Sequence, residues 1–279
     1  MDIISESTWG FEIEGGCDDY DGIKLSELGF EMGIDGSVRY INTIHDHCEI
    51  KTKGYFEDNK VIKKLNNFIE YLNEIKYVTN ESCGIHIHIG NLEIGQIMKL
   101  IKFMIDVEPI IFKLFPERLK SDYTGTLKHN CNRFVKKFNK IPINLLEVLS
   151  TKEQLKKIME DNTPYSGGFE NIFYRDVCTN LRSYFDNNRK TIEFRCFPGN
   201  YNHLTYYTDL LDKIVYLIKR NNIYNICNSY LLKINRTKEE EKLNILFDIL
   251  GISKESKMNL LSGIKIETQE SEETILDAA

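Results

Sequence analysis

The residues best suited to chemistry in this 279-residue sequence alternate with apolar residues in four short segments. Ionisable side chains two positions apart share one face of an extended strand. The segments are Phe11-Glu12-Ile13-Glu14, Cys48-Glu49-Ile50-Lys51, His86-Ile87-His88-Ile89 and Ile192-Glu193-Phe194-Arg195. If these segments are neighbouring strands, their polar faces form one concave wall.

For any one of these strands, a half-solvated antiparallel sheet is a sufficient interpretation. The set favours a site, because its polar positions are mostly Glu, His and Arg. Carboxylates at close quarters raise one another's pKa, and bound cations relieve this repulsion. Carboxylate and imidazole donors suit Mg²⁺, with Mn²⁺ as an alternative, and the absence of a thiolate pair disfavours Zn²⁺. The number of metals stays open. The wall would contain Glu12, Glu14, Glu49, His86, His88 and Glu193.

Three arginines complete the candidate site: Arg175, Arg182 and Arg195. A forked guanidinium group can bind phosphate or carboxylate through two hydrogen bonds. Metals together with arginines fit a site that handles a polyphosphate, although a single arginine is more often a surface ion-pair partner. The sequence has no Walker loop, no glycine fingerprint of a Rossmann fold and no GxSxG nucleophile elbow.

The elements that must position these residues are predicted from hydrophobic periodicity and from turn residues. Antiparallel strands with helices packed to one side make this an α+β fold. Predicted strands cover 9–14, 38–41, 48–51, 77–89 (with a turn or bulge at 80–84) and 191–197. Predicted helices cover 61–75, 94–115 and 204–219 with one or two more around 144–160, and 33–37 and 163–168 are turns or loops. Pro116 is expected to end the long helix at 94–115.

Composition narrows the class of protein. Hydrophobic residues make up 42% and charged residues 28%, and the net charge is −6, so we expect a globular protein without a nucleic-acid partner. No apolar run is long enough for a membrane span, and Met1–Ser7 does not resemble a signal peptide. Seven scattered cysteines without a CxxC pair indicate reduced thiols. Together these features predict a cytoplasmic protein.

Five motifs in order resemble the amidoligase family, which belongs to the carboxylate–amine ligase superfamily with glutamine synthetase. They are Gly10–Glu14, Asp35-Gly36-Ser37, Glu49, Cys83–His88 and Thr191–Arg195. The resemblance covers roughly residues 9–200. It implies a glutamine synthetase-like catalytic fold, which is a curved, mostly antiparallel sheet with helices packed outside. A catalytic domain over 1–235 would then precede a C-terminal helical patch and acidic tail over 236–279.

The resemblance also implies roles for individual residues. Glu12, Glu14, Glu49, His86 and Glu193 would be metal ligands. His88 would lie near the phosphates or the substrate, and Arg195 would contact the substrate carboxylate or an acyl phosphate. Arg175 and Arg182 would bind the phosphates of the nucleotide. Asp35 has no assigned role. Arg118, Tyr123 and Cys131 match a family element only loosely, so substrate-side residues in 117–140 stay unassigned.

The function that follows is an ATP-dependent ligase that joins a carboxylate to an amine through an acyl phosphate, with divalent metals. The carboxylate could be a small molecule, a peptide or a protein. One alternative is a metal-dependent hydrolase or phosphodiesterase that uses the same Glu and His cluster on a bound water. Another is a nucleotide- or metal-binding module without catalysis. The sequence does not identify the two substrates or the oligomeric state.

Overall fold

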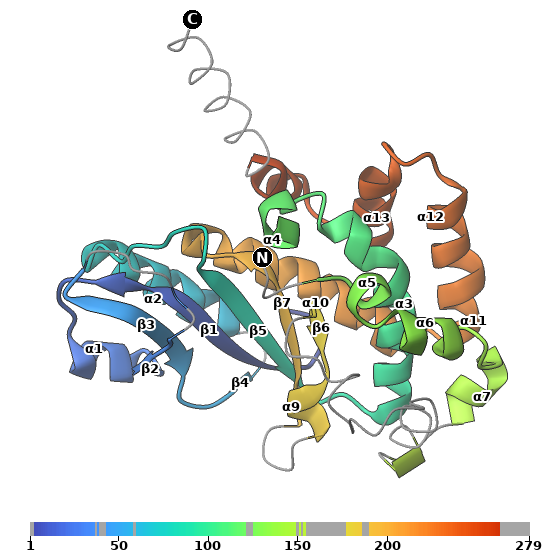
Figure 1. Cartoon of the computed structure of the whole chain (residues 1–279), viewed down its shortest axis with the longest axis horizontal. Helices are drawn as coiled ribbons and strands as arrows, with labels where there is room; N and C mark the ends of the chain where they lie inside the picture. Colours follow the sequence, from blue (N-terminus) through green and yellow to red (C-terminus); the bar gives the residue numbers. More distant parts are fainter. Residues whose placement is uncertain are drawn as a thin grey trace, which may run out of the picture.

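The structure of the protein is a computed structural model. Its strands and helices form an α+β fold (Figure 1). The structure describes residues 3–36, 38, 43–57, 60–120, 125–148, 151, 153–154, 177–185 and 190–262. In this part of the chain, no helix combines the length and the apolar character that crossing a bilayer requires.

A seven-stranded sheet runs through the described residues, and every strand pair in it is antiparallel. The path is β2-β3-β1-β5-β7-β6, and the short strand β4 also pairs with β1. The strands are β1 (Thr8–Cys17), β2 (Phe30–Ile34), β3 (His45–Thr52), β4 (Phe56–Glu57), β5 (Gly84–Gly90), β6 (Thr179–Asn180) and β7 (Ile192–Pro198). The long strand β1 therefore lies near the centre, between β3 and β5.

Apolar and polar side chains alternate along the strands, so one face of the sheet is apolar. The helices α2 (Val61–Glu74) and α10 (Leu204–Arg220) cover this face (Figure 1). Phe30 stacks on Phe68 of α2 with ring centroids 3.7 Å apart. Phe197 stacks on Tyr207 of α10 at 4.7 Å. These side chains belong to one hydrophobic core that also includes the buried face of α3 (Ile94–Ile111). The polar face of the same strands is thereby left for a site.

Shorter helices connect and extend these layers. They are α1 (Gly22–Glu27), α4 (Pro116–Lys120), α5 (Leu127–Asn130), α6 (Asn132–Phe138), α7 (Ile143–Val148), α9 (Arg182–Phe185), the 3₁₀ turn η3 (Tyr201–His203), α11 (Ile223–Asn225), the π-helical segment η4 (Ile226–Leu231), α12 (Leu232–Arg236) and α13 (Lys242–Leu250), followed by a helix over 254–262. The predicted domain boundary at residue 235 remains a prediction.

Several predicted elements agree with the structure, and others need correction. The predicted helices 61–75 and 204–219 are α2 and α10. Pro116 does not end the long helix, which stops at Ile111. Pro116 instead opens α4, where the missing N–H costs nothing. Most of the predicted strand at 38–41 and all of the loop at 163–168 lie outside the described residues.

The predicted turn at 33–37 and the predicted end of the first strand at Gly15 were wrong in extent, because strand pairing overrides local turn signals. Gly33, predicted to start a turn, lies in β2 opposite Glu49. Within the predicted strand 77–89, Val78 makes a single bridge with Gly16, and the regular strand begins at Gly84 after the predicted turn at 80–84. β1 continues through Gly15, where a Cβ would lie 2.4 Å from Tyr77 Cε1. Only glycine permits that close approach.

Candidate metal and ligand site on the polar face of the sheet

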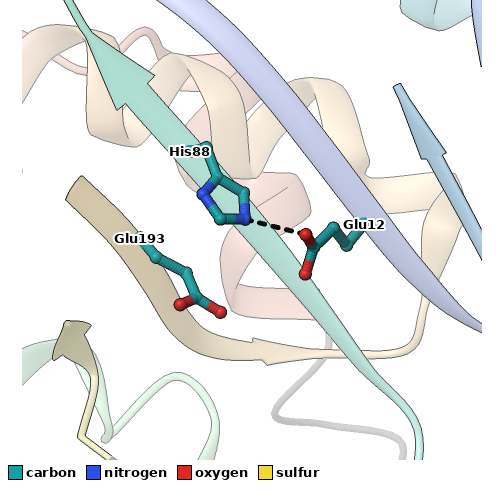
Figure 2. Close-up of side chains that lie close together, drawn as sticks. All are labelled: Glu12, His88 and Glu193. Carbon is teal, nitrogen blue, oxygen red and sulfur yellow. Dashed lines mark ion pairs between the residues drawn. The ribbon is translucent and has the colours of Figure 1, made fainter. Parts of the chain in front are cut away.

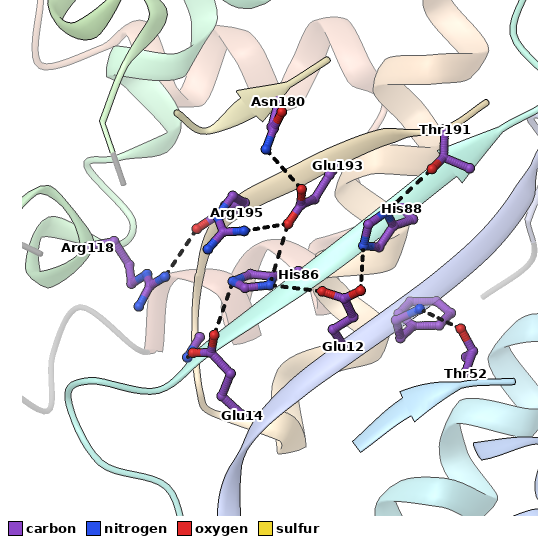
Figure 3. A network of polar contacts seen from close by, with 12 residues as sticks. Glu12, Glu14, Thr52, His86, His88, Arg118, Asn180, Thr191, Glu193 and Arg195 are labelled. Atoms are coloured by element: carbon purple, nitrogen blue, oxygen red, sulfur yellow. Dashed lines mark hydrogen bonds and ion pairs between the residues drawn. The ribbon is translucent and has the colours of Figure 1, made fainter. Parts of the chain in front are cut away.

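Strand register brings the predicted site residues together on the polar face (Figure 3). Glu12 of β1 lies opposite His86 of β5, and Glu14 lies opposite Glu49 of β3. Across the next pair, His88 lies opposite Glu193 of β7. Directly opposed residues in antiparallel strands have Cβ atoms only about 5 Å apart, so these side chains are within reach of one another.

His86 lies at the centre of this cluster. Its Nδ1 is 3.3 Å from Glu12 Oε2 and 3.5 Å from Glu193 Oε1, and its Nε2 is 3.6 Å from Glu14 Oε1. His86 as a whole is 2% exposed. His88 Nε2 is 3.2 Å from the other oxygen of Glu12. Glu12 thus faces a histidine with each carboxylate oxygen.

Among the described residues, two groups of donor atoms could each hold a cation. They are Glu12, His88 and Glu193 (Figure 2), and Glu12, Glu49 and His86, and within each group the donor atoms lie within 4.8 Å of one another. Carboxylate oxygens with one imidazole fit Mg²⁺ or Mn²⁺, and Mn²⁺ accepts the nitrogen more readily. Glu12 belongs to both groups. A carboxylate with two oxygens can bridge two such positions.

The pKa values of the Glu12 and Glu49 carboxyl groups are shifted in opposite directions. Burial alone would raise the pKa of Glu12, but hydrogen bonds and charge from His86 and His88 outweigh it and hold that pKa well below its usual range. Burial, followed by the charge of Glu12, raises the pKa of Glu49 to about 7. The charge of Asp35 contributes to this upward shift of the Glu49 pKa. A bound cation would favour the ionised form of every carboxylate in the cluster.

In the part of the chain that the structure describes, two buried arginines border the cluster. Arg195 is 6% exposed, and its guanidinium group donates to Glu193 Oε1 at 2.7 Å. Arg118 of α4, which is 3% exposed, donates to the backbone carbonyls of Cys83 and Arg195 (Figure 3). Arg195 was predicted for the site, whereas Arg118 had only a loose family match. A guanidinium pair beside carboxylates suits an anionic ligand that approaches a cation.

The side chains of the other two predicted arginines lie outside what the structure describes. Arg182 begins α9, two residues after Asn180 of β6. Arg175 lies outside the described residues. Their assignment to phosphate binding remains a prediction.

Sequence reasoning missed two polar residues that support the cluster. Asn180 Nδ2 donates to Glu193 Oε2 at 3.0 Å, and Asn180 is 2% exposed. Thr191 Oγ1 lies 3.4 Å from His88 Nδ1. Thr191 belongs to a quoted motif without a role, and Asn180 lies in a two-residue strand that has no alternation to reveal it. Both residues orient a candidate ligand from behind, as in known metal sites.

A hollow of about 230 Å³ opens beside the cluster. Its walls include Glu12 and His88 on one side and the connection between β3 and β4 on the other. The predicted ligands thus share one face of the sheet, and Glu12 reaches a cavity together with His88. The geometry can hold cations and place an anionic group next to them.

Comparisons with known proteins agree with the class of site. A family model described as "Putative amidoligase enzyme" matches residues 19–209, which is 191 of the 279 residues. The match contains Glu49, His86, His88, Glu193 and Arg195 and begins after Glu12 and Glu14. No curated protein matches the chain.

Proposed function

The chain belongs to the amidoligase enzyme family, and from that premise we propose that it is an ATP-dependent ligase that joins a carboxylate to an amine. The observation that carries the proposal is the convergence on one sheet face of Glu12, Glu14, Glu49, His86 and Glu193 with the guanidinium group of Arg195. A glutamine synthetase-like arrangement of the sheet is part of this proposal, and the antiparallel sheet with helices on one face supports it.

The reaction that such a site serves begins with an unreactive acid. A carboxylate is a poor electrophile, so one of its oxygens first attacks the γ-phosphorus of ATP, and ADP leaves with the bridging oxygen. The product is an acyl phosphate. An amine then forms a C–N bond with the carbonyl carbon, the C–O bond to phosphate breaks, and phosphate and a proton are released. The sum converts acid, amine and ATP to amide, ADP and phosphate.

The candidate ligands Glu12, Glu14, Glu49, His86 and Glu193 would hold Mg²⁺ or Mn²⁺ in this scheme. Such cations, when bound, screen the repulsion between the carboxylate and the polyphosphate. His88 would lie at the phosphate end, since it lines the hollow beside Glu12.

Arginine side chains would stabilise the negative charge that develops during phosphoryl transfer. Arg195, together with Arg182 and Arg175 as proposed, would stabilise the negative charge on the transferring phosphoryl group and the leaving oxygen. Burial makes the Arg195 guanidinium effective, because a charge in a low-dielectric setting interacts more strongly than one in water.

The test is phosphate release from ATP with Mg²⁺ or Mn²⁺ in the presence of a panel of amino acids and peptides. Wild type should release ADP and phosphate with one acid and amine pair and form the amide. Glu12→Gln and Glu193→Gln should each lower this turnover by at least a hundredfold, about 2.7 kcal/mol. Glu70→Gln, on the exposed surface of α2, is the matched control.

Two outcomes would replace the proposal. Hydrolysis of an ester or amide bond without any nucleotide would favour a metal-dependent hydrolase on the same cluster. Binding of Mg²⁺ and ATP with no ADP release for any substrate pair would favour a binding module. ADP release at the wild-type rate in Glu12→Gln would contradict the assigned role of Glu12.

A further inference from the structure

The edge strand β2 lacks the usual protection of a sheet edge. It stands at one end of the strand path, and in the part of the chain that the structure describes no strand pairs with its outer side. β2 contains no Pro and no Lys, and its register with β3 has no bulge. Proteins commonly use these features to block an exposed edge. The outer side of β2 is therefore suited to pairing with another strand.

The hydrogen bonds between β2 and β3 define which backbone groups of β2 face outward. The Lys53 N–H donates to the Gly29 carbonyl at 3.0 Å, and the Asp35 N–H donates to the His47 carbonyl at 2.7 Å. In an antiparallel ladder, residues that bond to the neighbouring strand alternate with residues whose N–H and C=O groups point to the other side. The outward residues of β2 are therefore Phe30, Met32 and Ile34.

The side chains of these three residues form a row on the apolar face of the sheet. Phe30 is buried and stacks on Phe68, and Met32 is half-buried against the core. Ile34 ends the row and is 89% exposed. The row thus leaves the core at the same edge where the backbone groups face outward, and a partner strand would cover both.

A second copy of β2 fits this edge by symmetry. A two-fold axis through Met32 pairs Met32 with its own counterpart and Phe30 with Ile34 of the second copy. All of these are outward residues, so each pair can exchange two backbone hydrogen bonds. Ile34 then lies opposite the buried Phe30 and extends the core of the other copy. An axis through Glu31 would instead place like charges directly opposite each other, which is unfavourable.

Charge on the polar face supports the same register. With the axis at Met32, Glu31 of each copy lies opposite Gly33 of the other. Gly33 has no side chain, and Lys51 Nζ lies 3.9 Å from the position that a Cβ would take there. Lys51 also lies opposite Glu31 of its own chain. The ammonium group of each Lys51 would therefore lie between two Glu31 carboxylates, one from each copy.

We propose that the protein forms a two-fold dimer in which the β2 strands of two copies pair antiparallel about Met32 and join the two sheets into one. The dimer places Glu31 of the second copy beside Lys51, which lines the hollow at the candidate site. This inference goes beyond the proposed function and does not depend on it.

The test is analytical ultracentrifugation of the full chain over a series of concentrations. Wild type should sediment at twice the monomer mass in the upper part of the series. Ile34→Lys and Ile34→Pro should each raise the dissociation constant by roughly a hundredfold or more, because each substitution occurs twice at the interface. Proline removes an outward N–H and leaves the bonds to β3 in place. Met258→Lys, at a position 61% exposed in the helix over 254–262, is the control and should dimerise like wild type.

A cysteine on the axis tests the register. Met32→Cys would place two thiols on residues that face each other with Cα atoms about 5.5 Å apart, which is within the range of a disulfide. Oxidised glutathione should then convert the variant to a covalent dimer, as the two thiols form one disulfide and the oxidant is reduced to two glutathione thiols. Wild type, in which every cysteine except Cys227 is buried, is the control and should give no covalent dimer.

Three results would overturn the inference. Wild type that stays monomeric over the whole series would show that the β2 edge is not a dimer contact. A dimer that persists in both Ile34→Lys and Ile34→Pro would place the interface on another surface. A wild-type dimer without a Met32→Cys cross-link would exclude this register. The ligase proposal would stand in each case, because ATP turnover tests it separately. Circular dichroism of each variant confirms that it is folded.

Discussion

At the scale of single residues, the site is defined by how firmly Glu193 is oriented. Asn180 donates to one of its oxygens at 3.0 Å, and Arg195 donates to the other at 2.7 Å. All three side chains are buried, so these bonds form in a low-dielectric setting where an unmet partner is costly. Glu193 is therefore preorganised to present its remaining lone pairs toward His86 and Glu12.

Removing Asn180 should loosen that orientation without removing a proposed ligand. We expect Asn180→Ala to weaken Mn²⁺ binding by roughly tenfold to a hundredfold, as is typical for groups that orient metal ligands. Asn66→Ala, at an exposed position of α2, is the control. Calorimetric titration with Mn²⁺ measures the effect. Unchanged affinity in Asn180→Ala would mean that Arg195 alone fixes Glu193.

At the scale of secondary-structure elements, a buried carboxylate ties α3 to two segments near the site. Glu108 lies in the last turn of α3 and is 0% exposed. One oxygen accepts from the Leu127 N–H of α5 at 2.6 Å and the other from the Thr179 N–H of β6 at 3.1 Å. Because Asn180 follows Thr179 in β6, Glu108 also fixes the strand that supports Glu193.

The ionisation of Glu108 should make stability depend on pH. Burial raises its pKa from 4.5 to about 7, although the hydrogen bonds from Thr179 and Leu127 oppose the shift. A raised folded-state pKa means that this contribution is fully present below pH 4.5 and is lost as pH rises to about 7. The neighbouring Cys131 and Cys178 thiols have raised pKa values and stay neutral in this range.

We therefore expect the unfolding free energy of wild type, relative to Glu108→Gln, to fall by about 3 kcal/mol between pH 4.5 and pH 8. Urea unfolding of both proteins across this range measures the difference, and carboxylates common to both cancel. The glutamine in Glu108→Gln makes imperfect hydrogen bonds, which lowers the unfolding free energy by the same amount at every pH. This constant difference does not change how the comparison depends on pH. A difference that is flat with pH would show that folding does not raise the pKa of Glu108.

Local patterns predicted the elements that carry the ligands, and long-range pairing supplied the others. Four site residues could be predicted from the sequence because each alternates with buried apolar residues such as Phe11 and Ile87. They are Glu12, His86, His88 and Glu193. β4 and β6 have two residues each, so only their pairing with β1 and β7 defines them. Asn180 and Arg118 enter the site through that register and through α4, which no single-strand periodicity reveals.

At the scale of the whole molecule, one face of the sheet brings together site residues from positions 12 to 195. The other face of the sheet packs against the hydrophobic core. Trp9, Phe11 and Ile13 alternate with Gly10, Glu12 and Glu14 along β1, so one strand serves both the packing and the site. The family match begins at residue 19 and therefore does not include this strand. The assignment of Glu12 and Glu14 consequently rests on the register of β1 with β3 and β5.

Cation binding should stabilise the entire fold, because the proposed ligands come from four different strands. Unfolding separates β1, β3, β5 and β7, so a cation binds the native state alone and adds about 2.7 kcal/mol at one hundred times its dissociation constant. For a chain of this size we expect a rise of several degrees in the thermal midpoint with Mn²⁺, reversed by a chelator. Glu12→Gln should abolish most of the rise, because Glu12 belongs to both donor groups, whereas Glu70→Gln should keep it. Equal stabilisation of Glu12→Gln and wild type would place the cation elsewhere on the molecule and remove the physical basis for assigning the strands a shared site.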